Sequence, residues 1–128
     1  MPSWGEFAHD LSILLTMVWV LLVEAKQTPF WPLGFALAAA ASVTPGVADP
    51  AQAALAVAVL AGVALPRQRR VLRLQAVAIL GVGGAVGTLS RTGGPLCYPD
   101  SIWQGHGFWH LAAATSLAIW GLAIRSRE

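Results

Sequence analysis

Two histidines near the end of the chain, His106 and His110, have the spacing that most clearly suggests chemistry. Residues four apart on a helix lie on one face, so both imidazoles would point the same way. Two imidazoles at this spacing can bind one Zn²⁺ from a single helix. They can also ligate a haem or a chlorophyll, one imidazole each, or form hydrogen bonds to other helices without a ligand. The spacing alone leaves all three interpretations open.

The N-terminal segment offers the other groups that a metal site needs. A hydrolytic zinc site normally has three protein ligands and one open position for water. The only other histidine in the chain is His9, which is followed directly by Asp10. Asp10 can orient a ligand or a bound water, but the two residues can equally form a polar cap at the start of the first helix. If the pair binds zinc, we expect His9 to be the third metal ligand beside His106 and His110.

The composition of the chain is that of a membrane protein. Hydrophobic residues make up 56% of the sequence and charged residues 11%, whereas a soluble domain carries about 25% charged residues. The mean hydropathy is +0.64. A soluble fold of this size could not cover its surface with so few charges. The net charge of +2 is too small and too scattered to indicate a nucleic-acid partner.

Apolar runs separated by charged residues, prolines or glycines predict an all-α transmembrane bundle of about five helices in a single domain, residues 1–128. The expected helices are 10–23, 30–47, 51–65, 71–89 and 102–124, the last opened by a capping box of Ser101 and Gln104. A span needs roughly 17 to 25 residues, so the first and third segments are short. Gly83 and Gly87 have small-xxx-small spacing and are expected to pack closely inside the bundle.

The basic residues predict the orientation of the bundle. If the helices alternate in direction, seven of the eight fall on one side, which the positive-inside rule makes cytoplasmic. These seven are Lys26, Arg67, Arg69, Arg70, Arg73, Arg125 and Arg127, and the exception is Arg91. We therefore expect the N-terminus outside and the C-terminus inside, in a bacterial inner membrane.

The stretch around the two histidines resembles the C-terminal signature of the alkaline ceramidases, seven-helix membrane hydrolases related to the adiponectin receptors. Residues 99–114 read PDSIWQGHGFWHLAAA. The family's last helix carries a Gln-Gly-His-x-x-Trp-His pattern, matched here by Gln104, Gly105, His106, Trp109 and His110. Residues 4–15, WGEFAHDLSILL, resemble the family's third helix, with Asp10 at the position of its aspartate.

The resemblance implies a zinc-dependent amide hydrolase of membrane lipids, in which His106 and His110 hold zinc and Asp10 is the catalytic residue that handles protons. It also implies that this chain corresponds to helices three to seven of the family, whose second helix supplies a Ser and a His that have no counterpart here. His9 would then replace the missing ligand, or another membrane protein chain would supply it. The alternative is a non-catalytic subunit of a larger membrane complex, which can contain a pigment or haem.

Overall fold

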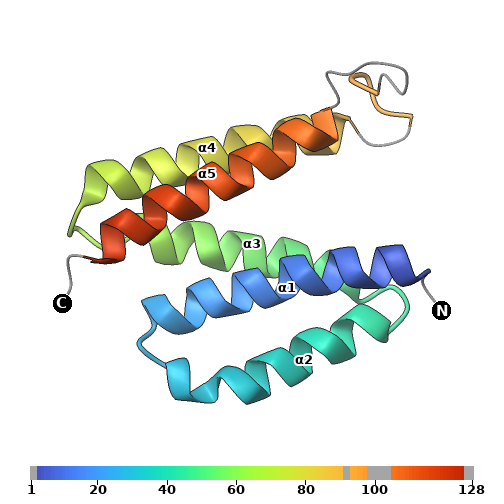
Figure 1. Cartoon of the computed structure of the whole chain (residues 1–128), viewed down its shortest axis with the longest axis horizontal. Coiled ribbons are helices and arrows are strands. Elements are labelled where there is room, and N and C mark those ends of the chain that lie inside the picture. The colour runs from blue at the N-terminus through green and yellow to red at the C-terminus, as the bar shows by residue number, and fades with distance from the viewer. Residues whose placement is uncertain (1–2, 91–92, 98–104, 126–128) are drawn as a thin grey trace. The chain divides into compact units, whose positions relative to one another are not determined.

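The computed structural model describes residues 3–90, 93–97 and 105–125, and every regular element within these ranges is helical. The elements are α1 Trp4–Glu24, the 3-10 helix η1 Thr28–Phe30, α2 Trp31–Val43, α3 Ala48–Ala64, α4 Arg70–Leu89 and α5 Gly105–Arg125 (Figure 1). The predicted all-α fold is therefore confirmed. Four residues on which expectations from the sequence rest lie outside the described ranges, namely Arg91, Ser101, Gln104 and Arg127.

Three of the described helices, α1, α4 and α5, are long enough and apolar enough to cross a membrane, with 21, 20 and 21 residues. The helices α2 and α3 are also apolar but have only 13 and 17 residues. At 1.5 Å per residue, α2 is about 20 Å long, whereas the hydrocarbon core of a bilayer is about 30 Å thick. The chain is an integral membrane protein with transmembrane helices.

The first helix is longer than expected because it begins at Trp4. Ser3 is its N-cap: the Ser3 hydroxyl accepts from the Glu6 backbone N–H at 3.3 Å, and the Glu6 carboxylate accepts from the Ser3 N–H at 2.8 Å. This reciprocal pair is a capping box, whose Ser-x-x-Glu spacing is visible in the sequence. The expectation that the first segment is short was therefore wrong, and His9 and Asp10 do not cap the helix.

Prolines set the ends of the two shorter helices. The segment 30–47 gives a helix that ends at Val43, because Thr44 precedes Pro45 and has an extended backbone with ψ of 118°. In contrast, α3 begins at Ala48, three residues earlier than expected. Pro50 lies in its first turn, where the missing N–H breaks no helical hydrogen bond.

Helices α1, α2 and α3 form one compact unit, Met1–Leu65. A Cβ added to Gly34 of α2 would lie 2.6 Å from the Val18 side chain of α1, so this glycine allows a close approach of the two helices. Asp10 of α1 contacts Gln52 of α3, and further along Leu21 lies beside Gly62. In these two contacts, the higher-numbered residue of α1 meets the higher-numbered residue of α3. These two helices therefore run parallel, and their N-terminal ends lie at the same end of the unit.

Helices α4 and α5 form the second compact unit, Pro66–Glu128, as an antiparallel pair (Figure 1). A Cβ added to Gly83 would overlap Ala112, and one added to Gly87 would lie 3.0 Å from the Trp109 Cβ. Trp109 thus lies in a groove that the glycines open along α4. The close packing expected of Gly83 and Gly87 occurs within the chain itself, so this face of α4 is already covered.

The substitution Gly83→Ala is expected to destabilise the α4–α5 pair by about 1 to 3 kcal/mol, the usual cost of overpacking. The added methyl group would collide with Ala112. Gly81→Ala is the matched control on the same helix, because nothing lies within 4 Å of its added Cβ. Thermal unfolding in detergent micelles measures both effects. Equal melting temperatures for the two variants would contradict the tight groove.

Candidate metal centre

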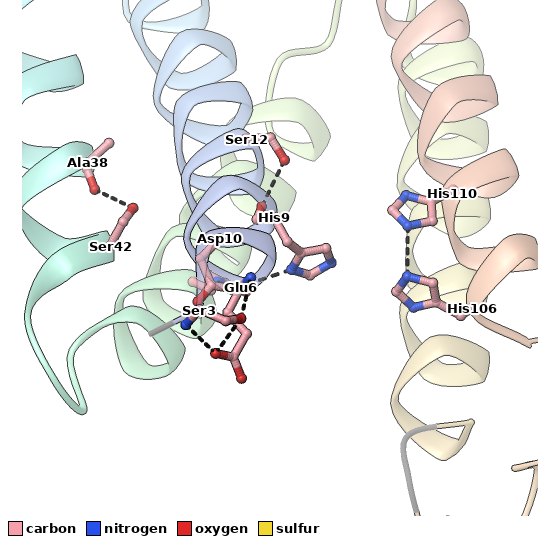
Figure 2. Close-up of polar contacts among 10 residues, drawn as sticks. Ser3, Glu6, His9, Asp10, Ser12, Ala38, Ser42, His106 and His110 are labelled. Carbon is pink, nitrogen blue, oxygen red and sulfur yellow. Dashed lines mark hydrogen bonds and ion pairs between the residues drawn. The ribbon is translucent and has the colours of Figure 1, made fainter. Parts of the chain in front are cut away.

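His106 and His110 lie one turn apart in the first half of α5, and their rings face each other (Figure 2). The two Nε2 atoms are 2.9 Å apart, and the ring planes meet at 87°. A neutral imidazole has one donor and one acceptor nitrogen. At this distance one ring therefore donates a hydrogen bond to the other. The predicted alignment of the two histidines on one helix face is confirmed.

The same geometry fits a tetrahedral metal ion. With Zn–N bonds of about 2.0 to 2.1 Å, two ligand nitrogens lie about 3.3 Å apart. The observed separation of 2.9 Å is only slightly shorter. A small change in side-chain torsion would convert the hydrogen-bonded pair into two ligands of one ion. Two imidazoles are nevertheless one ligand fewer than a hydrolytic zinc site normally has.

The imidazole pair lies on a part of α5 that does not pack on α4. The side facing α4 is formed by Trp109, Ala112 and Ser116, whose hydroxyl donates to the Ala76 carbonyl at 2.7 Å. A helix turns about 100° per residue, so the imidazoles point roughly a quarter to a third of a turn away. Both histidines are exposed. Ionisable side chains are costly in lipid and usually face a partner or a cavity, which makes this face a candidate site.

His9 and Asp10 lie in the second turn of α1, and their side chains contact each other (Figure 2). The His9 Nδ1 atom is 3.3 Å from the Asp10 Oδ1 atom, and both residues are partly buried. Adjacent residues diverge by about 100° on a helix, but here the imidazole turns toward the carboxylate. Because Nδ1 faces Asp10, Nε2 is the nitrogen through which His9 would bind a metal.

Gln52, which no motif in the sequence singles out, completes this group. Its Nε2 atom donates to Asp10 Oδ1 at 2.9 Å. The two residues are 42 positions apart, so no local spacing links them. They meet because α1 and α3 are parallel neighbours. The sequence does hold one sign that Gln52 has a partner: it is the one polar side chain of the apolar helix α3 beyond its first turn.

Comparison of the chain with known protein families, curated proteins and solved structures finds no match. The resemblance to alkaline ceramidases therefore rests on the sequence pattern of residues 104–110 and on Asp10. In that pattern, Gly105 and Trp109 pack against α4: an added Cβ at Gly105 would overlap Ser90. His106 and His110, the other described residues of the pattern, lie on the exposed side of α5. His9 belongs to the first compact unit, so its meeting with the pair in α5 stays a prediction.

Proposed function

We propose that this chain carries the metal site of a zinc-dependent amide hydrolase of membrane lipids, similar to the alkaline ceramidases. The observation that supports this proposal best is the pair of Nε2 atoms of His106 and His110, 2.9 Å apart on an exposed face of an apolar helix. Ionisable groups within membrane helices usually mark functional sites, and this spacing suits one ion. His9 would be the third ligand, or a partner membrane protein would supply it.

The proposed reaction is the hydrolysis of an N-acyl lipid that reaches the site sideways from the bilayer. Zinc would polarise the amide carbonyl and allow water to react near neutral pH. The water oxygen bonds to the carbonyl carbon, and the carbon–nitrogen bond breaks. The Asp10 carboxylate accepts one proton from the water and passes it to the departing nitrogen, first as general base and then as general acid. The products are a fatty acid and a long-chain amine.

A second candidate function is that of a non-catalytic subunit in a larger membrane complex. The lengths of α2 and α3, 13 and 17 residues, favour it. Helices shorter than a full span suit positions where neighbouring protein covers their ends. If such a complex contained a pigment or haem, the two histidines of α5 would be its natural ligands.

One experiment on the purified chain, kept with any co-purifying partner in mild detergent, separates the two candidates. We expect about one zinc ion per chain by elemental analysis and release of fatty acid from an N-acyl sphingoid lipid. A chelator should stop this release, and added zinc should restore it. A zinc-free, inactive protein would support the non-catalytic subunit. Visible absorption would identify a pigment or haem and would end the hydrolase proposal.

We also propose that the C-terminus lies in the cytoplasm of a bacterial cell and the N-terminus outside. The exposed side chains of Arg67, Arg69 and Arg70 precede or begin α4, and Arg125 ends α5. Since α4 and α5 are antiparallel, these charges gather at one end of the second unit. A reporter that works only in the cytoplasm should be active when fused after Glu128. Activity of an exported reporter at that position would reverse the assignment.

A further inference from the structure

The carboxylate of Asp10 receives two contacts on the same oxygen. Gln52 Nε2 donates to Asp10 Oδ1 at 2.9 Å from α3, and His9 Nδ1 lies 3.3 Å from this oxygen on α1. The side chains of both His9 and Asp10 are partly shielded, with 40% and 24% of their surfaces exposed. Such shielding strengthens hydrogen bonds relative to those in water. Within the described part of the chain, Oδ2 is the carboxylate oxygen left for transferring a proton.

The donor and acceptor roles in this group follow from the carboxylate. An ionised carboxylate only accepts, so the Gln52 amide must present its N–H group to Asp10. For the same reason, a neutral His9 that bonds to Asp10 carries its proton on Nδ1. The lone pair of the ring then lies on Nε2. Gln52 ties Asp10 to a second helix, which limits the side-chain torsions available to the carboxylate.

We propose that Gln52 is a positioning residue that acts through Asp10 on His9. The amide holds the carboxylate where Oδ1 accepts from His9 Nδ1, and this hydrogen bond keeps the lone pair on Nε2. The inference deepens the proposed function, because it rests on His9 as a metal ligand. A carboxylate behind an imidazole ligand commonly fixes its tautomer and orientation in metal sites. Here the amide of a neighbouring helix would in turn support the carboxylate.

The tautomer of His9 can be measured without any metal. The measurement is nitrogen NMR of histidine-labelled, zinc-free protein in micelles, recorded where the ring nitrogen shifts themselves report a neutral imidazole. The His9 signal is assigned by its loss in His9→Ala. We expect the Nδ1–H tautomer in the unmodified chain and a mixture of tautomers in Gln52→Met, which keeps the shape but removes the donor. Gln52→Lys restores a donor and should restore the tautomer.

Two controls distinguish positioning from a general loss of structure. Gln27→Met makes the same chemical change at an exposed turn after α1 and should leave the tautomer unchanged. Asp10→Ala removes the acceptor and should reproduce the effect of Gln52→Met. An unchanged His9 tautomer in Gln52→Met would overturn the inference. So would a tautomer change that Gln52→Lys fails to reverse.

Zinc affinity then separates this inference from the proposed function. Competition with a chromophoric chelator should show a loss of about 10- to 100-fold in Gln52→Met, the usual effect of removing an outer-shell partner. If the unmodified chain binds no zinc, the proposed function fails, while the NMR result still decides the role of Gln52. If zinc binds equally well to both proteins and the tautomer is the same, the proposed function stands and the role of Gln52 is refuted.

Discussion

The double substitution His106→Ala and His110→Ala is expected to reduce bound zinc from about one ion per chain to background. It removes two of the three expected ligands, so the loss of affinity should exceed about 100-fold, the upper end for loss of an outer-shell partner. The bundle should stay folded, because the α4–α5 contact rests on Trp109 in its groove and on the hydrogen bond from Ser116 to Ala76. Elemental analysis and thermal unfolding in micelles measure the two effects.

A matched control for this experiment is Thr115→Ala on the same helix. The Thr115 hydroxyl donates to the Leu111 carbonyl of its own helix at 2.8 Å, and its loss should change neither zinc content nor melting temperature appreciably. Stoichiometric zinc in the double variant would show that the ion is held elsewhere. A collapse of the fold in that variant, with Thr115→Ala intact, would show that the imidazoles stabilise the bundle instead.

The second large effect concerns Asp10→Asn, which should lower amide hydrolysis by about 10²- to 10⁴-fold, the usual contribution of a general acid–base residue. An amide oxygen can still accept from His9 Nδ1, but the side chain can no longer take a proton from water. Zinc content should therefore change little. The initial rate of fatty-acid release at saturating zinc measures the effect independently of metal affinity.

Asp49→Asn provides the control for this measurement, because Asp49 is an exposed acid in the first turn of α3. Asp49 lies in the same compact unit as His9 and Gln52, but among the described residues no hydrogen bond connects it to either of them. It should leave the rate within about twofold of that of the unmodified chain, as surface changes away from a site usually do. An equal rate in Asp10→Asn would remove Asp10 from the proposed chemistry.

Local signals in the sequence determine most of the helix ends. Pro45 ends α2 through its effect on Thr44. Pro66 directly follows Leu65, the C-cap residue of α3. Helix α1 begins before the expected residue 10, because its capping box of Ser3 and Glu6 stands before the continuous apolar run. Hydropathy alone locates the apolar part of a helix, while its first turn can be polar and capped.

The partners of the helices could not be predicted from spacing. Gly83 and Gly87 indicated a close approach, but only the structure shows that Trp109 fills their groove. The contact between Asp10 and Gln52 depends on α1 and α3 being parallel neighbours, which no local pattern encodes. The alignment of His106 and His110 needed only the period of one helix, and that prediction was confirmed.

The packing of Trp109 in the groove of α4 also fixes the rotation of α5 about its own axis. Trp109 directly precedes His110, and an added Cβ at Gly87 would lie only 3.0 Å from the Trp109 Cβ. An atom about 6 Å from a helix axis moves about 2 Å when the helix rotates by 20°, and a displacement of 1 Å in a catalytic site can cost about 100-fold in rate. The glycines of the α4 groove, which take no part in the proposed chemistry, therefore fix the direction in which the imidazoles of His106 and His110 point.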